Sequence, residues 1–118
     1  MTAQLVVITG AGAGIGKALA QRFSGAGHPC LLISRHQDPD PALDGGSVIY
    51  RQLDVSDAGA LGEAIASAER EHGPTGCLIN NAGIQHRKPL QDFELSDYDR
   101  LMDVNLRGSF LLAREASK

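Results

Sequence analysis

The chain has 118 residues, of which 42% are hydrophobic and 21% charged, and this length and composition suit one globular domain. Its formal charge is −3 and it has no run of basic residues, so it is a poor candidate for binding nucleic acid or a membrane surface. No apolar run approaches the roughly 20 residues that a membrane helix needs. The N-terminus lacks the basic and apolar regions of a signal peptide, so the sequence predicts a cytoplasmic protein.

The two cysteines, Cys30 and Cys77, both lie inside apolar runs. Neither has a partner at a spacing typical of a metal site. We interpret them as free thiols that pack as small core residues in a reducing compartment, and we expect no metal site.

Strand-like and helix-like patterns alternate along the chain. Apolar runs predict strands at residues 4–9, 30–34, 47–53 and about 76–80. Helices are expected at residues 15–25, from 56 to the Gly73-Pro74 stop, and from 96 to 117. Residues 36–46 contain Pro39, Pro41 and two glycines, so a loop is expected there, with room for one helical turn.

The helix starts and apolar faces follow from local sequence. Ser56 is a natural N-cap for the second helix, and Ser96 with Asp99 forms a capping-box variant for the third. The apolar positions expected to face the core are, helix by helix, Ile15, Ala18, Leu19 and Phe23; Leu61, Ala64, Ile65 and Ala68; Leu101, Val104, Phe110 and Leu111.

Strands that alternate with helices predict an α/β fold with right-handed crossovers. We expect a Rossmann-like, doubly wound parallel sheet in which the four strands have the order 3-2-1-4. Ligands of such sheets bind where the order reverses, at the carboxyl ends of strands 1 and 4. The turns after these two strands would then border one crevice.

A glycine-rich turn, Thr9-Gly10-Ala11-Gly12-Ala13-Gly14-Ile15-Gly16, joins the first strand to the first helix. Free backbone N–H groups and the helix dipole suit the start of a helix to hold a phosphate. The spacing does not fit G-x-G-x-x-G, nor the mononucleotide loop that ends in Gly-Lys-Ser/Thr. It fits T-G-x-x-x-G-x-G.

Three further motifs follow in order: Asp54-Val55, Asn80-Asn81-Ala82-Gly83, and Val104-Asn105-Leu106-x-Gly108-x-Phe110. Together with the glycine turn, they make the sequence resemble the commonest type of the short-chain dehydrogenase/reductase family over essentially all 118 residues. The resemblance implies an NAD(P)-binding Rossmann domain over residues 1–118.

The resemblance also implies roles for single residues. The glycine turn, with Gly10, Gly14, Ile15 and Gly16, would approach the diphosphate of the cofactor. Asp54 would bind the adenine amino group, and Val55 would lie beside the ring. The turn of Asn81, Ala82 and Gly83 would lie beneath the cofactor, and Asn105 would help hold a water of the catalytic proton relay. Asp54 could instead be a plain loop acid, and Asn81 could only brace its turn.

Cofactor choice depends on the end of the second strand, where Ser34 occupies the place of the acid that selects NAD. Arg35 offers a planar fork of donors that fits a 2′-phosphate. We therefore expect NADP(H) to be preferred, with NAD(H) possible. Arg35 as a solvated loop residue, or Asp38 turned back toward the ribose, are the alternatives.

The catalytic Y-x-x-x-K pair of the family is absent, since neither Tyr50 nor Tyr98 precedes a lysine by four positions. We expect the chain to be the N-terminal, cofactor-binding half of an oxidoreductase that acts on a small-molecule carbonyl or secondary alcohol. The helix at 96–117 would then supply part of the interface of a homodimer or homotetramer. The alternative is a non-catalytic dinucleotide-binding, sensor or interaction protein.

The loop after Gly83 gives the one hint about substrate. It contains His86, Arg87 and Lys88, and it is locally similar to sugar-acid dehydrogenases of the same family. These side chains could attract a carboxylate, but we favour a solvated loop.

Overall fold

The computed structural model describes residues 3–11, 14–35, 47–85 and 87–118. The elements, in chain order, are β1 (Leu5–Thr9), α1 (Gly14–Gly25), β2 (Cys30–Ser34), β3 (Val48–Gln52), α2 (Ala58–His72), β4 (Thr75–Ile79), a 3₁₀ turn η1 (Leu90–Asp92), α3 (Leu95–Met102), a π-helical segment η2 (Asp103–Arg107) and α4 (Gly108–Ala116). All four predicted strands are present. The predicted loop at residues 36–46, which includes Asp38, lies outside the described residues.

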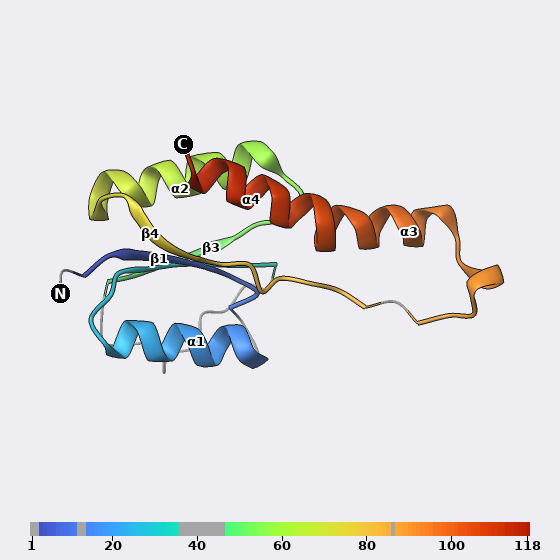
Figure 1. The fold of residues 1–118 in the computed structure, drawn as a ribbon, viewed down its shortest axis with the longest axis horizontal. Coiled ribbons are helices and arrows are strands. Elements are labelled where there is room, and N and C mark those ends of the chain that lie inside the picture. Colours follow the sequence, from blue (N-terminus) through green and yellow to red (C-terminus); the bar gives the residue numbers. More distant parts are fainter. Residues whose placement is uncertain (1–2, 12–13, 36–46, 86) are drawn as a thin grey trace.

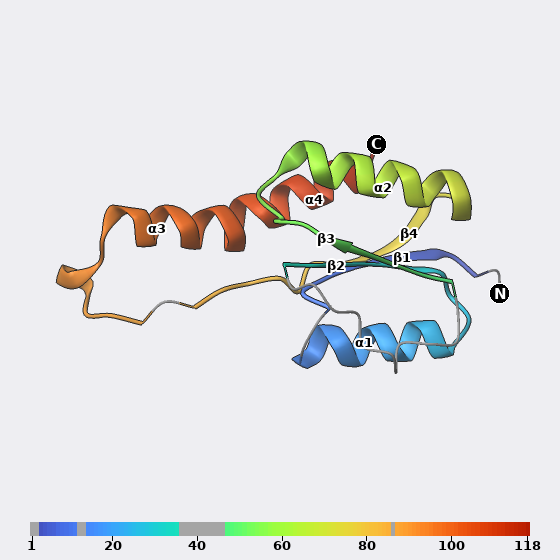
Figure 2. The same cartoon turned by 180° about the vertical axis from the view of Figure 1, so that it is seen from behind.

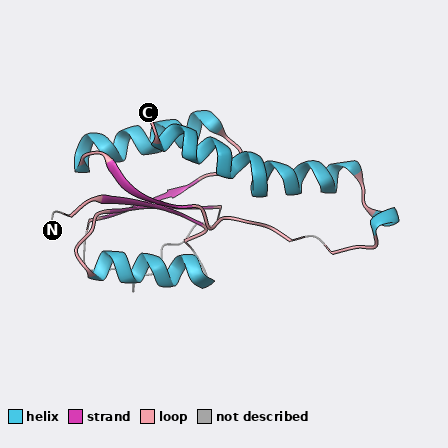
Figure 3. Ribbon diagram, viewed as in Figure 1, coloured by secondary structure: helices cyan, strands magenta, loops and turns pink. Residues whose placement is uncertain are grey.

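The strands form one parallel sheet in the order β3-β2-β1-β4, as predicted. Helix α1 covers one face of the sheet, and α2 with α4 covers the other (Figures 1 and 2). The α/β fold with a doubly wound parallel sheet is therefore confirmed. Figure 3 shows the three layers, with α3 extending beyond the sheet on the side where β1 and β4 end.

The hydrophobic core lies on both faces of β1 and β2, whose residues are all buried. One cluster joins the sheet to α2 and α4, and the other joins it to α1. Cys30 is in the second cluster, where burial raises the pKa of its thiol to about 11. Cys77 lies on the edge strand β4 and is only partly buried; both cysteines are free thiols, as predicted.

Helix α1 packs through small residues, which corrects the predicted apolar face. Its buried positions are Gly16, Ala20 and Ser24, whereas Ile15 is 73% exposed. Small side chains let the helix approach the sheet closely, and Leu19 and Phe23 pack at the sides of the contact. The predicted face of α2, in contrast, is confirmed at all four positions.

Both predicted helix caps were wrong by one or two residues. The N-cap of α2 is Asp57, whose carboxylate accepts a hydrogen bond from the backbone N–H of Ala60 at 3.1 Å. Helix α3 is capped by Glu94 and not Ser96; the carboxylate of Asp97 accepts a hydrogen bond from the Glu94 N–H. Each new cap satisfies free N–H groups at the start of its helix.

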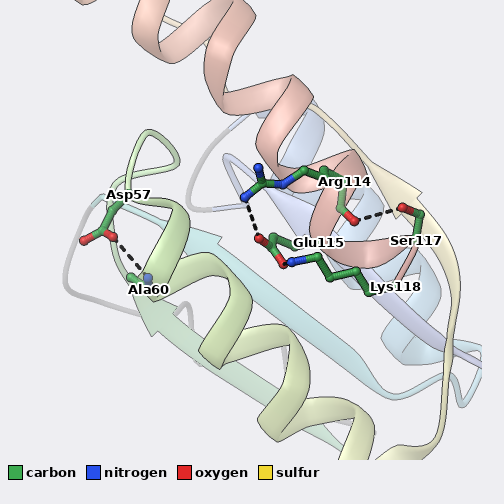
Figure 4. A network of polar contacts seen from close by, with 6 residues as sticks. All are labelled: Asp57, Ala60, Arg114, Glu115, Ser117 and Lys118. Atoms are coloured by element: carbon green, nitrogen blue, oxygen red, sulfur yellow. Dashed lines mark hydrogen bonds and ion pairs between the residues drawn. The ribbon is translucent and has the colours of Figure 1, made fainter.

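The third predicted helix is one helical run over residues 95–116, interrupted by η2. Of its predicted face, Val104 and Leu111 are buried, but Phe110 is 63% exposed. At its end Glu115 pairs with Arg114 and Lys118, while α2 begins nearby with its Asp57 cap (Figure 4). Among the described residues, none of these helices is long and apolar enough to cross a membrane.

Candidate functional site

A cleft opens at the carboxyl ends of the strands, where the strand order reverses between β1 and β4. Its volume is about 250 Å³. Its lining comes from the ends of β1, β2, β3 and β4 and from η2: Gly10, Ile33, Ser34, Arg35, Leu53, Val55, Asn81, Ala82, Gly83, Ile84 and Val104. The sheet order thus brings together segments more than 70 positions apart, at the place that the strand order predicts.

The backbone conformation of the glycine turn requires glycine at positions 10 and 14, because Gly10 has φ of 65° and Gly14 has φ of 58°. These left-handed values suit glycine. A Cβ on Gly14 would meet nothing within 4 Å, so this position is open toward solvent. A Cβ on Gly16 would lie 2.5 Å from Asn81 Nδ2 and still closer to the Gly10 carbonyl oxygen. Gly16 therefore lets α1 start directly against the turn after β4.

Thr9 connects the glycine turn to the turn after β4. It belongs to the glycine motif, but from the sequence we assigned it no role. Its buried hydroxyl oxygen accepts hydrogen bonds from the backbone N–H groups of Asn81 at 3.1 Å and Ala82 at 2.9 Å. Asn81 Nδ2 in turn donates to the Gly10 carbonyl at 3.2 Å. Asn81 does brace its turn, in keeping with the simpler of the two interpretations.

At the end of β2, Ser34 is buried and Arg35 is exposed on the cleft wall. The Arg35 carbonyl accepts a hydrogen bond from Gln52 Nε2 at 3.1 Å, which fixes the backbone at this point. No described residue forms an ion pair with the Arg35 guanidinium. The side chain is thus placed where it can meet an anion entering the cleft.

Asp54 follows β3, between the two cleft residues Leu53 and Val55, but does not itself line the cleft. Its Oδ1 accepts from the Ser56 N–H at 2.9 Å and the Ser56 hydroxyl at 2.7 Å, and its Oδ2 from Arg100 Nη1 at 2.8 Å. Partial burial raises the pKa of Asp54, but the hydrogen bonds from Ser56 and Arg100 together outweigh this effect and lower it. The carboxyl is ionised at neutral pH.

Val55 is buried beside the cleft and packs against Gly108 at the start of α4. A Cβ on Gly108 would lie 2.6 Å from Val55 Cγ2. The helical run can therefore reach the cleft wall only because position 108 has no side chain.

Asn105 lies in η2, where the Gly108 N–H donates to the Asp103 carbonyl, five residues back. Its Nδ2 donates to the Ile84 carbonyl at 2.9 Å, and its Oδ1 accepts from the Ile84 N–H at 2.8 Å. Such π-helical segments occur often at functional sites. Asn105 therefore holds the chain that follows the β4 turn, and its assignment to a proton relay stays a prediction.

The predicted site residues thus fall into two groups. Six line the cleft: Gly10, Arg35, Val55, Asn81, Ala82 and Gly83. The other five do not line it: Gly14, Ile15, Gly16, Asp54 and Asn105. In the loop after β4, Lys88 forms an ion pair with Asp97 at 3.1 Å, and His86 lies outside the described residues. In the part of the chain that the structure describes, no three His, Cys, Asp or Glu side chains gather as a metal site.

Known proteins share both the sequence pattern and the fold. The family model described as short chain dehydrogenase matches residues 4–118. Gluconate 5-dehydrogenase of Gluconobacter oxydans is 33% identical, over 95% of this chain and 46% of its own. The chain thus spans about half the length of the curated relatives it matches.

Two solved structures show the same arrangement. A short-chain dehydrogenase/reductase from Serratia marcescens has a TM-score of 0.84 and 30% identity, over 97% of this chain and 51% of its own. A 3-ketoacyl-(acyl-carrier-protein) reductase from Brucella melitensis, solved with NADH, has a TM-score of 0.86 and 29% identity, over 95% of this chain and 48% of its own. With its fold, its glycine turn and the matched family model, the chain belongs to the short-chain dehydrogenase/reductase family.

Proposed function

We propose that residues 1–118 form the dinucleotide-binding half of an NAD(P)-dependent oxidoreductase. The nicotinamide would exchange a hydride with a carbonyl or secondary alcohol. The observation that carries this proposal is the cleft at the strand-order reversal, bordered by the glycine turn of β1 and the turn after β4. The lengths of the relatives support the view that this chain is one half of such an enzyme.

The residues present fit the diphosphate and the adenine of a dinucleotide. Gly14 leaves open space at the start of α1, where free N–H groups and the helix dipole favour a diphosphate. Val55 and Ile33 supply apolar walls for an adenine ring, with the Asp54 carboxylate nearby as an acceptor. Their task is to bind and orient; the acid–base residues of the reaction would lie in the remainder of the enzyme.

Within this proposal, NADP(H) is the preferred cofactor. The support is local: an exposed Arg35 on the cleft wall, with no acidic side chain at Ser34 to repel an added phosphate. NAD(H) remains the alternative, since two solved relatives were crystallised with this cofactor, one with NAD and one with NADH.

Binding measurements on the 118-residue chain test this preference. The wild type should bind NADPH at least tenfold more tightly than NADH, and Arg35→Ala should remove most of that difference. Arg51→Ala is the matched control, because Arg51 is an exposed arginine on β3 that does not line the cleft. Tighter binding of NADH by the wild type would contradict the assignment of Arg35.

A non-catalytic dinucleotide-binding or sensor protein is the second candidate, because no described residue supplies the Tyr and Lys of the family's chemistry. The gene decides between the two. A reading frame that continues beyond codon 118 into a strand and Y-x-x-x-K supports the oxidoreductase; a genuine stop codon there favours the sensor.

The remaining proposals concern substrate, assembly and compartment. A small carbonyl or alcohol is the proposed substrate class, and we narrow it no further because Lys88 is already paired with Asp97. The run over residues 95–116 exposes Leu95, Tyr98, Leu106 and Phe110, and it supports assembly of the parent as a homodimer or homotetramer. The free cysteines fit a reducing cytoplasm.

A further inference from the structure

The last hydrogen bonds between β2 and β3 lie directly beside Arg35, on the cleft wall. In the parallel ladder Ser34 pairs with Gln52, and the Leu53 N–H donates to the Ser34 carbonyl at 3.0 Å. Strand β2 ends at Ser34, so the carbonyl of Arg35 lies beyond the strand. Gln52 Nε2 donates to this carbonyl at 3.1 Å. The side chain of Gln52 therefore extends the connection between β2 and β3 by one residue.

This hydrogen bond restrains the backbone that carries the Arg35 side chain. Because its acceptor is the carbonyl of residue 35 itself, it limits rotation about the Cα–C bond of Arg35 and fixes the peptide plane that follows. The guanidinium has no ion-pair partner among the described residues, so the backbone is the part of Arg35 that they hold in place. A side chain on a fixed backbone loses less conformational entropy when it binds an anion.

We propose that Gln52 is a positioning residue, which keeps Arg35 on the cleft wall and so strengthens the preference for a dinucleotide with a 2′-phosphate. This inference rests on the proposed function and adds to it a residue of the neighbouring strand that does not line the cleft. Gln52 touches no atom of the cofactor and acts only through Arg35. Loss of its hydrogen bond should therefore weaken the binding of NADPH and leave the binding of NADH nearly unchanged.

Gln52 is suited to a test because its replacement disturbs little else. It is exposed, and β3 lies at the end of the described strand order. Gln52→Met keeps a side chain of similar length and removes the donor. Arg51→Ala is the matched control, because Arg51 is the preceding exposed residue of β3 and its Nη1 donates to the Tyr50 carbonyl.

The experiment measures the dissociation constants of NADPH and NADH by calorimetry on the 118-residue chain at about pH 7. Gln52→Met should weaken NADPH binding about threefold, which is less than a whole hydrogen bond can contribute, because the bond acts indirectly. Its affinity for NADH should match that of the wild type. Arg51→Ala should leave the ratio of the two constants unchanged.

A double-mutant cycle with Arg35→Ala gives a readout that a merely structural role would not move. Residues that act through one another show non-additive effects, whereas independent residues show additive ones. In the Arg35→Ala background, Gln52→Met should therefore no longer change the ratio of NADPH to NADH affinity.

The outcomes separate this inference from the proposed function. If Gln52→Met weakens NADPH and NADH by the same factor, or changes the ratio equally with and without Arg35, the role of Gln52 is only structural and the inference is overturned. If the wild type binds both dinucleotides equally well, Arg35 does not bind the 2′-phosphate and the inference fails, although binding itself would still support a dinucleotide-binding half. If neither dinucleotide binds, both proposals fail.

Discussion

The hydroxyl oxygen of Thr9 lies 2.9 Å from the backbone nitrogen of Ala82 and accepts its hydrogen bond. The two residues are 73 positions apart, one at the end of β1 and the other in the turn after β4. Asn81 donates its own N–H to the same oxygen at 3.1 Å. One buried hydroxyl therefore fastens together the two turns that border the cleft.

Thr9→Val should lower the free energy of unfolding by about 1–3 kcal/mol, because the isosteric side chain leaves the N–H groups of Asn81 and Ala82 without this acceptor. Dinucleotide affinity should fall as well, since the β4 turn loses its anchor. Urea denaturation and calorimetry measure the two effects. Thr9→Ser keeps the hydroxyl and is the control; a valine variant as stable as the serine variant would refute this role.

Gly16 and Gly14 should respond differently to alanine. A Cβ at position 16 would overlap the Gly10 carbonyl, so Gly16→Ala should displace α1 from the β4 turn and destabilise the fold by several kcal/mol, at the upper end for single substitutions. At Gly14 there is open space, and the cost is that of a left-handed φ, about 1 kcal/mol. Thermal unfolding measures the loss of stability in each variant. An equal loss in Gly16→Ala and Gly14→Ala would contradict the difference that we expect between the two positions.

The elements that were predicted correctly are those whose signal is local. The strands are short apolar runs bounded by turns, and α2 has an unbroken apolar face. Both predicted caps were wrong because neighbouring polar residues compete for the N-cap position. Ser56 is bonded to the Asp54 carboxylate, which leaves Asp57 to cap α2. The face of α1 was wrong because close packing there favours small residues over large apolar ones.

The residues around the cleft also divide into those that a local motif predicts and those whose contacts depend on the folded arrangement. The family motifs located Gly10, Asn81 and Val55, all of which line it. No spacing in the sequence indicates that Arg100 meets Asp54, or that Asn105 meets Ile84, because these pairs form only when α3 and η2 lie across the ends of the strands. The π-helical hydrogen bond of η2, which joins residues five positions apart, is also not indicated by any periodicity in the sequence.

Asn105→Ala should release the chain segment that follows the β4 turn. Both side-chain hydrogen bonds to the Ile84 backbone disappear, so the Ile84 amide should exchange with solvent roughly tenfold faster. Hydrogen exchange followed by NMR measures this directly. Asn80→Ala is a matched control, because Asn80 makes one longer hydrogen bond, 3.4 Å, to the Ser109 carbonyl. Unchanged exchange at Ile84 would show that the segment is held by other contacts.

The ion pair between Asp54 and Arg100 should give the chain a pH-dependent stability. The pKa of Asp54 is lower in the folded chain than its ordinary value, so the folded state favours the ionised form. The stabilisation is therefore complete above the pKa of the unfolded chain, about 3.9, and is lost as the pH falls through the lower folded value. Because both side chains are over a third exposed, its size should be modest, about 0.2–1 kcal/mol.

Comparison of wild type with Asp54→Asn, which does not titrate, isolates this effect. The wild type should be the more stable of the two near pH 7, and the difference should shrink below about pH 4. Carboxyl NMR titration adds a direct measure: Arg100→Ala should raise the pKa of Asp54, while Arg114→Ala should leave it unchanged, since Arg114 pairs with Glu115. A carboxyl that titrates identically in the Arg100→Ala variant would show that Ser56 alone holds Asp54.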